Sequence, residues 1–326
     1  MLDELLEIVL ENKGSDLHLI EGLSPSMRVD GKIYRIKPPD FENGNKLAEQ
    51  ILTDRQRKIL EERGDVDAAY NPQTLNIQTR VNVYRDSTGI SFAFRLIPDK
   101  IPSMDDLMFP ISMRNMTKEM HGLILVTGPT GSGKTTTLAA MLQHIADNRY
   151  GNIVTLEDPI EYKLRPTLSI ISQREIGLHC DSFASGLKAA LRQDPDVIMV
   201  GELRDAETIS TALAAAETGH LVFATLHTAN VIEAVDRLAQ YFPPSDRKTI
   251  LMELANSFIG IVSQRLFAKK KGGRVAAYEI LTRNEATVNM IRSDAIFRVA
   301  DYMRPENGMQ TMEKAIQGLQ NLGLIN

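Results

Sequence analysis

The chain has little of what nucleic-acid-binding proteins usually contain. It has no tryptophan and only 6% aromatic residues, and its net charge is −5 with both signs interspersed. A nucleic-acid-binding surface usually brings a basic excess or stripe. The basic run Lys269-Lys270-Lys271 is short, and we interpret it as a solvated loop. We therefore expect no nucleic-acid partner.

Cysteine is almost absent, because Cys180 is the only one among 326 residues. A single cysteine excludes a disulfide within the chain and a four-cysteine zinc site, and it fits a reducing compartment. The first residues include Asp3, Glu4 and Glu7 where a signal peptide would be basic and then apolar. No apolar run approaches the about 20 residues of a membrane span. We expect a cytoplasmic protein, with any membrane association through a partner.

Residues 1–97 predict a small α+β domain. Apolar residues recur at helical spacing from Leu2 to Leu10, and Gly14 follows as a stop. Asp30-Gly31 indicates a hairpin turn, and His18 falls on the polar face of a short strand, where we interpret it as structural. Further elements are expected as a helix over 46–63 with Asp54 as its cap, and strands over 16–19, 66–70, 79–84 and 90–97.

The pattern changes after residue 122. Short continuous apolar runs alternate with helical stretches, which is typical of a mostly parallel sheet buried on both faces. After residue 245 we expect mainly helix and one more strand, over 274–281. The domains are therefore 1–97, a proline-containing linker over 98–110, and an α/β domain over 111–326. The apolar runs are 123–126, 153–156, 197–200 and 221–226.

Residues 128–135 match the phosphate-binding pattern G-x4-G-K-[ST]. The motif follows an apolar strand and precedes an alanine-rich helix, which is the context that it requires. The helix N-terminus adds about half a positive charge for phosphate. We expect Lys134 to bridge the β- and γ-phosphates of ATP and the Thr135 hydroxyl to hold Mg²⁺. The residues expected to bind the nucleotide are Gly128, Thr130, Gly131, Ser132, Gly133, Lys134, Thr135 and Thr136.

Acidic residues follow two of the predicted strands. Glu202 comes just after the run 197–200, where it can reach Mg²⁺ together with Thr135. The run 153–156 leads into Glu157, Asp158 and Glu161, a cluster that is unfavourable unless a cation or a catalytic task balances it. We predict that Glu161 orients and deprotonates the attacking water, with Glu157 as the second candidate.

Two histidines flank the predicted strand 221–226. His227 follows its carboxyl end, whereas His220 precedes its start, roughly 23 Å away at about 3.3 Å per residue. Only His227 is at the edge where a ligand is expected, so it can sense the γ-phosphate. A structural role is the alternative for His227 and the preferred interpretation for His220.

Residues 79–98 predict a hairpin whose turn is 86–89. In that register, paired residue numbers sum to 175, so Arg80 lies directly across from Arg95. Like charges directly opposite each other destabilise a sheet. We therefore expect an anion over the pair, with ATP as the candidate, in the manner of an arginine finger. Two solvated surface arginines are the alternative.

Several motifs occur in order along nearly the whole chain. With them, the chain resembles the type II/type IV secretion ATPase superfamily, and most closely the type IV pilus retraction ATPases (PilT-like). The motifs are SDLHL at 15–19, the loop at 128–135, TLEDPIE at 155–161, LRQDPDVIMVGELRD at 191–205, TGHLVFATLHT at 218–228 and GMQTM at 308–312.

The resemblance implies a homohexameric ring whose subunits have an N-terminal PAS-like domain and a C-terminal RecA-like ATPase domain. It implies that ATP binds between the domains, and that domain rotations drive an inner-membrane platform protein during pilus retraction and twitching motility. By position, Glu161 matches the catalytic glutamate of the family, Glu202 the Walker B glutamate, and His227 the second histidine of the His box. Arg80 and Arg95 match the arginines of the N-terminal domain.

Two departures from family patterns bear on the finer function. Pilus assembly and type II secretion members usually carry a tetracysteine motif and a longer N-terminal region, which speaks against them. Retraction members carry AIRNLIRE, where this chain has ATVNMIRS at 286–293, so Val288 and Ser293 replace an arginine and a glutamate. A PilT-like ATPase of a secretion or conjugation apparatus is therefore the alternative. A RecA-like DNA motor and a non-catalytic nucleotide-binding regulator are more distant ones.

Overall fold

The chain forms two compact units, Met1–Lys100 and Ile101–Asn326. The computed structural model describes residues 2–29, 31–37, 40–70, 72, 75, 77–97 and 100–326. Asp30, expected in a hairpin turn, and Pro98, expected at the start of a linker, lie outside the described residues. The strands expected on either side of Asp30 do pair as a hairpin, with Val29 opposite Lys32.

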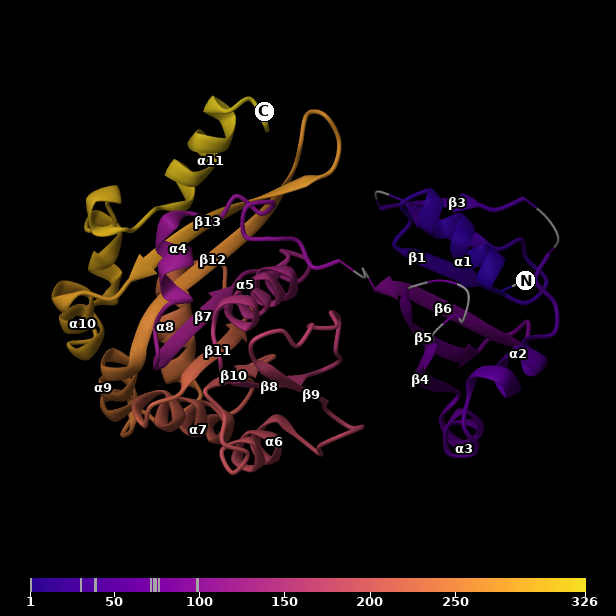
Figure 1. The fold of residues 1–326 in the computed structure, drawn as a ribbon, viewed down its shortest axis with the longest axis horizontal. Coiled ribbons are helices and arrows are strands. Elements are labelled where there is room, and N and C mark those ends of the chain that lie inside the picture. The colour runs from indigo at the N-terminus through magenta and orange to yellow at the C-terminus, as the bar shows by residue number, and fades with distance from the viewer. Residues whose placement is uncertain are drawn as a thin grey trace. The chain divides into compact units, whose positions relative to one another are not determined.

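The first unit is built on a six-stranded antiparallel sheet in the order β3-β2-β1-β6-β5-β4 (Figure 1). Its helices cover one face, where Leu6 and Val9 are buried together with Leu17 and Phe94 of the strands. The elements are α1 (Leu2–Glu11), β1 (Asp16–Leu19), β2 (Ser26–Val29), β3 (Lys32–Arg35), α2 (Gly44–Ile51), α3 (Asp54–Arg63), β4 (Asp65–Tyr70), β5 (Gln78–Arg85) and β6 (Ile90–Ile97).

The single helix predicted over 46–63 is wrong, because the structure has α2 and α3 with a break between them. Thr53 provides the reason. Its hydroxyl accepts from the backbone N–H of Gln56 at 3.3 Å, while the Gln56 side chain accepts from the Thr53 N–H at 3.0 Å. This reciprocal capping box starts a new helix, so the cap is Thr53 and not Asp54.

The predicted β5–β6 hairpin is confirmed residue by residue. Val81 pairs with Phe94 and Arg80 pairs with Arg95. The apolar pair is fully buried in the core of the unit. Because side chains alternate along a strand, the two arginines project from the opposite face.

The second unit contains a seven-stranded sheet in the order β13-β12-β7-β11-β10-β8-β9. All neighbouring strands are parallel except β12 and β13, which are antiparallel. The elements are α4 (Ile111–Met116), β7 (Gly122–Thr127), α5 (Lys134–Asn148), β8 (Asn152–Glu157), β9 (Ile170–Glu175), α6 (Phe183–Ala190), β10 (Val197–Val200), α7 (Ala206–Glu217), β11 (Leu221–Leu226), α8 (Val231–Gln240), α9 (Arg247–Ser257), β12 (Phe258–Ala268), β13 (Arg274–Thr282), α10 (Glu285–Arg292), η1 (Ile296–Asp301), η2 (Pro305–Asn307) and α11 (Met312–Asn321).

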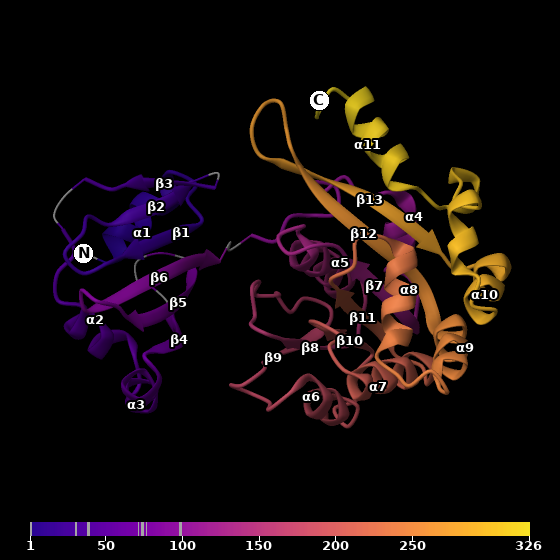
Figure 2. The same cartoon turned by 180° about the vertical axis from the view of Figure 1, so that it is seen from behind.

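Helices cover both faces of this sheet. Along β7, Leu123 and Leu125 pack with the helices α7, α8 and α9, whereas Ile124 and Val126 pack with α4 and α5. Figure 1 shows the face with α4 and α5, and Figure 2 shows the face with α8. The apolar runs of the sequence are therefore strands buried on both sides, as predicted for a parallel sheet.

Two strands, β9 and β12, were not predicted from sequence. Because β12 and β13 both follow residue 245, the expectation of one strand there is wrong. β12 was missed because Ser263 and Gln264 interrupt its apolar run, although both are buried. Their side chains donate to backbone carbonyls, Ser263 to Ala229 at 3.0 Å and Gln264 to Ser132 at 2.5 Å. β9 was missed because none of its residues is fully buried and its last four, Ser172 to Glu175, are polar.

The proline-containing segment expected as a linker is mostly part of the second unit. Met104 and Phe109 are buried in its core, and the Phe109 ring packs edge-on against Tyr278 with ring centres 5.5 Å apart. The basic run Lys269-Lys270-Lys271 follows β12 at the turn into β13. No helix of the described residues is long and apolar enough to cross a membrane.

Candidate functional site

The carboxyl ends of β7, β8, β10 and β11 meet at one edge of the second sheet, since these strands are parallel neighbours. In such sheets, ligands bind beyond this edge. The loop after β7 is the phosphate-binding motif, and the predicted acids follow β8 and β10. The topology alone therefore brings together the loop, the acids and His227, which follows β11.

Glycines shape the loop between β7 and α5. Gly128, Gly131 and Gly133 have φ values of 147°, 77° and 89°, which side-chain-bearing residues rarely adopt. A Cβ atom at Gly128 would also lie 2.5 Å from the carbonyl oxygen of Gln264. The sequence thus needs glycine here both for backbone conformation and for the close approach of β12. Helix α5 starts at Lys134, so its free N–H groups face the loop.

Lys134 is buried, with a relative exposure of 9%. Its ammonium donates to the carbonyl oxygens of Gly128 at 2.8 Å and Pro129 at 3.3 Å. Burial lowers the pKa of Lys134, and the nearby carboxylates of Glu202 and Glu161 raise it. These two carboxylates are therefore the negative charges that the lysine experiences most strongly.

One cavity of about 300 Å³ joins the predicted catalytic residues of this unit. Of the other nucleotide-binding residues predicted from sequence, Thr130 and Gly131 line it directly. Gly128, Ser132, Gly133 and Thr136 belong to the same loop and the first turn of α5. The cavity is lined by the predicted residues Lys134, Thr135, Glu161, Glu202 and His227.

His227 lies between a cation and an anion. Its Nδ1 is 3.4 Å from the Lys134 ammonium, and its Nε2 is 3.3 Å from Glu202 Oε2. The same oxygen accepts from Arg204 Nε at 2.8 Å, and Arg204 also lies 3.4 Å from Asp158. A charged chain therefore runs across the cavity wall from the loop lysine to the acids. Arg204, which belongs to this chain of contacts, was not predicted from sequence.

The acids after β8 occupy different environments. Glu157 has a relative exposure of 5%, and burial raises its pKa against the opposing effect of hydrogen bonds from Thr155 and Gln173. Glu161 is exposed at the cavity wall. A general base must reach a water beside the phosphate. Glu161 meets that requirement better, which agrees with the preference drawn from sequence.

The histidine at the other end of β11 lies away from the cavity. His220 Nδ1 is 3.0 Å from the carbonyl oxygen of Ala215, so the ring holds the end of α7. That placement matches the structural interpretation of His220.

The arginine pair belongs to the first unit and has partners there. Arg80 Nη2 is 3.3 Å from Asp67 Oδ2, and Arg95 Nε is 3.0 Å from Asp16 Oδ1. Each positive charge is thus offset by a carboxylate on a neighbouring strand. The repulsion for which an external anion was expected is thus already offset within the unit, by partners on strands that the hairpin alone does not reveal. Whether the pair also contacts ATP stays a prediction.

Other residues that support the site were also missed. Gln264 on β12 donates to the Ser132 carbonyl at 2.5 Å and accepts from the Thr137 hydroxyl at 2.8 Å, so it joins the loop to α5. Tyr162 places its hydroxyl 2.9 Å from that of Thr136. These contacts join segments far apart in sequence, and no local pattern announces them.

The donor set of the cavity fits Mg²⁺. The Thr135 hydroxyl and the Glu202 carboxylate both line the cavity and offer oxygen atoms, and Mg²⁺ usually takes one or two protein ligands beside phosphates and waters. Among the described residues, no group of three or more His, Cys, Asp or Glu could hold a metal ion. A metal that depends on phosphate for the rest of its ligands suits that arrangement.

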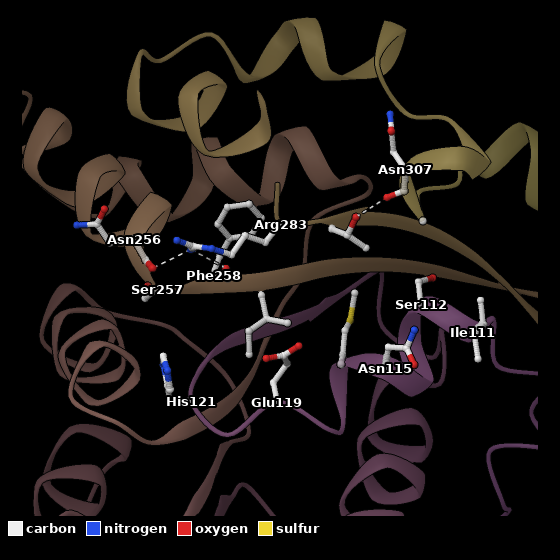
Figure 3. A pocket seen from close by; sticks show the side chains of 14 residues that line it. Ile111, Ser112, Asn115, Glu119, His121, Asn256, Ser257, Phe258, Arg283 and Asn307 are labelled. Atoms are coloured by element: carbon white, nitrogen blue, oxygen red, sulfur yellow. Dashed lines mark hydrogen bonds between the residues drawn. The ribbon is translucent and has the colours of Figure 1, made fainter. Parts of the chain in front are cut away.

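A larger hollow, of about 460 Å³, lies elsewhere in the second unit (Figure 3). It is near the start of β7 and β12, away from the loop. Its Arg283 already donates to three carbonyl oxygens at the end of α9, at 2.7 to 3.1 Å. Figure 3 shows Glu119 and His121 across the hollow from Asn256 and Arg283. This hollow lacks a phosphate-binding loop, so we assign the site to the smaller cavity.

A phosphate-binding loop on a parallel sheet, with acids at the ends of neighbouring strands, defines a P-loop nucleotide-binding protein of mixed α/β fold. The family described as type II/IV secretion system protein matches residues 1–322, and the chain belongs to that family. The resemblance inferred from the motifs is thereby confirmed.

Individual relatives narrow the comparison. The chain is 40% identical over 329 residues to the type IV pilus retraction ATPase PilT of Pseudomonas aeruginosa, covering 100% of this chain and 95% of that protein. It is 42% identical over 308 residues to a twitching motility protein of Neisseria gonorrhoeae, covering 93% and 82%. The crystal structure of the pilus retraction motor PilT with bound ADP superimposes with a TM-score of 0.93 at 42% identity, covering 99% of this chain and 94% of that one.

Proposed function

We propose that this chain is a PilT-like ATPase that converts Mg-ATP hydrolysis into pilus retraction. One observation carries the enzymatic part. The loop lysine, the Thr135 hydroxyl and the carboxylates of Glu161 and Glu202 line a single cavity beyond the carboxyl ends of the strands. Nucleotide binding at this edge is supported by the ADP-bound structure of the similar motor.

The loop residues hold the phosphates. Backbone N–H groups at the start of α5 point toward the bound anion, and the Lys134 ammonium leaves its loop carbonyls for the β- and γ-phosphates. Thr135 and Glu202 would hold Mg²⁺, which would neutralise charge that develops on the phosphates. Glu161 lines the same cavity as these residues.

Glu161 accepts the proton of the attacking water. Its carboxylate lines the cavity together with Lys134, and it is one of two carboxylates that raise the pKa of that lysine. His227 bridges Lys134 and Glu202, so it can register whether the γ-phosphate is present and pass that change to Glu202. Arg80 and Arg95 of the first unit supply further positive charge to the phosphates.

The motor is a homohexamer that acts on an inner-membrane platform protein. The names of the relatives, a pilus retraction ATPase and a twitching motility protein, support this choice of machinery. Mass measurement in solution with a non-hydrolysable ATP analogue tests the ring. A strict monomer under all conditions contradicts it.

A PilT-like ATPase of another secretion apparatus is the second candidate, on one observation. Val288 packs against the core and Ser293 caps the end of α10 through the Asn289 carbonyl at 2.6 Å. Retraction members carry charged residues at both positions, so this helix presents a different surface. Co-purification of the membrane partner distinguishes the two machines.

The enzymatic proposal is tested by turnover of the purified chain. Mg-ATP hydrolysis that stops with EDTA and does not depend on DNA is the expected result. Stimulation by DNA would favour a nucleic-acid motor, and nucleotide binding without turnover would favour a regulator.

A further inference from the structure

The segment that carries Glu161 is tied to strand β9 on both sides of that residue. Before it, the Ile160 N–H donates to Glu175 Oε2 at 3.1 Å. After it, Gln173 Nε2 donates to the Tyr162 carbonyl at 2.9 Å, and Gln173 Oε1 accepts from the Leu164 N–H at 2.9 Å. One glutamine side chain therefore fixes the backbone immediately beyond the catalytic candidate.

The same glutamine also binds the buried acid of the cluster. Gln173 Nε2 donates to Glu157 Oε1 at 3.0 Å, and Thr155 donates to the same oxygen at 2.6 Å. The backbone of Glu161 also lowers the pKa of the Glu157 carboxyl. Gln173, Glu157 and the Glu161 segment thus form one hydrogen-bonded group at the end of β8.

We propose that Gln173 is a positioning residue for Glu161, because its amide joins the Glu157 carboxyl to the backbone on the far side of Glu161. The inference rests on the proposed ATPase function. Gln173 sits on the edge strand β9 and does not line the cavity itself, so it acts through the segment it holds. A misplacement of about 1 Å in a catalytic group can lower a rate by about 100-fold.

Electrostatics gives the arrangement a second consequence. The hydrogen bond from Gln173 lowers the pKa of Glu157, in opposition to burial. Without this donor, the pKa of Glu157 rises further, because burial and the neighbouring charge of Glu161 both raise it. The acidic limb of the rate profile should then move to higher pH.

The test compares two variants of one glutamine with a matched control. Gln173→Met keeps the approximate size of the side chain but removes its amide group. Gln173→Ala removes both the amide group and most of the side-chain volume. The control is Gln143→Ala, since Gln143 clamps the same segment farther along, accepting from the Arg165 N–H at 2.8 Å and donating to its carbonyl at 3.0 Å. Thermal unfolding shows that each variant is folded.

We expect kcat to fall roughly 10- to 100-fold in both Gln173 variants, with ADP affinity unchanged and the acidic limb of the rate profile at higher pH. Gln143→Ala should retain kcat within about twofold, because it does not contact the Glu157 group. Combining Gln173→Met with Glu157→Gln should cost less than the product of the single effects, since both act on one group.

The outcomes separate this inference from the function on which it rests. A wild-type chain without Mg-ATP turnover overturns the proposed function. An active wild-type chain with normal kcat in Gln173→Met overturns the positioning role alone. Equal losses in the Gln143 and Gln173 variants would mean general loosening of the segment, and multiplicative effects in the double variant would mean independent residues. Equal losses or multiplicative effects would each overturn the positioning role of Gln173.

Discussion

The two units hold their key positive charges in different ways. In the second unit, Lys134 is buried, and the carboxylates that influence it line the same cavity. In the first unit, the Arg95 side chain is 65% exposed, and both arginines lie beside carboxylates of their own sheet. A buried lysine in a glycine loop identifies a phosphate site by itself, whereas exposed, paired arginines require a functional measurement.

The largest effect should come from the second unit. Lys134→Ala removes the only ammonium that contacts the loop carbonyls in the described structure, so nucleotide binding or turnover should be abolished. A turnover assay with labelled-nucleotide binding checks this. The control is Lys188→Ala, because Lys188 is an exposed partner of Glu207 and should have no effect. Near-wild-type turnover in Lys134→Ala would remove the loop from the mechanism.

Removing the arginines tests whether the positive charges of the first unit also contribute to ATP turnover. Arg80→Ala and Arg95→Ala should each lower turnover by about 10³-fold if the arginines act on phosphate, as arginine fingers do. For Arg80→Ala the free energy of unfolding should change by no more than about 1 kcal/mol, since its pair with Asp67 is exposed. Arg95→Ala should cost more stability, because it removes the nearest cation from the largely buried Asp16 carboxylate. Chemical denaturation measures the free energy of unfolding. Arg57→Ala, which removes another exposed pair of this unit, serves as control.

Normal turnover in the double variant would leave Arg80 and Arg95 as surface residues. If Arg80 and Arg95 do act on ATP, assemblies mixed from two variants show whether they act on the nucleotide of their own chain or of another subunit. Activity restored on mixing Arg95→Ala chains with Lys134→Ala chains would indicate sites shared between subunits. Inactive mixtures would indicate that both groups serve the nucleotide of one chain.

A smaller effect is expected at the metal ligand. Glu202→Gln should raise the Mg²⁺ concentration needed for half-maximal turnover, because a neutral amide is a weaker ligand than a carboxylate. It should also weaken the contacts that Glu202 makes with His227 and Arg204. Titration of the rate with Mg²⁺ measures the change, and an unaltered metal dependence would assign the metal to another residue.

The smallest effect concerns pH and the first unit. Burial lowers the pKa of His18 from 6.5, and among its neighbours Asp16 raises the pKa whereas Arg28 and Arg95 lower it further. Because the unfolded chain binds this proton more readily, stability is full above pH 6.5 and falls as the pH drops below it. Hydrogen exchange in strand β1 at pH 7.5 and 5.5 should show this loss, and His18→Asn should reduce it. An equal loss in the variant would assign it to other groups.

Burial has the opposite consequence for Glu157 in the second unit, whose pKa it raises. The folded state then binds a proton more readily than the unfolded chain, so this carboxyl disfavours folding at neutral pH and does so less as the pH falls. His18 and Glu157 therefore contribute to stability with opposite signs as the pH falls.

Local patterns were sufficient to predict the loop, its strand–loop–helix context, the main parallel strands and the hairpin register of Arg80 and Arg95. Each depends on nearest neighbours or on a fixed periodicity. The strand β12 and the buried Gln264 were not predictable in this way, whereas the break at Thr53 was missed although Thr53 and Gln56 form a local capping signature. A capping box competes with helix continuation, and a buried amide is stabilised only by partners more than a hundred residues away.

The same distinction applies to the site. Glu161, Glu202 and His227 were predicted because strand ends mark the ligand edge of a parallel sheet. Gln173 and Arg204 were not, since their importance depends on side-chain contacts across strands. The carboxylates beside the arginines were missed for the same reason.

The central claim is that Glu161 is the acid that activates water in a Mg-ATP site. The most direct measurement is single-turnover hydrolysis by Glu161→Gln and Glu157→Gln at saturating Mg-ATP, with analogue binding measured in parallel. The account predicts that Glu161→Gln binds the analogue normally and hydrolyses ATP very slowly, while Glu157→Gln retains more of the rate. Normal hydrolysis in Glu161→Gln with an inactive Glu157→Gln would contradict it.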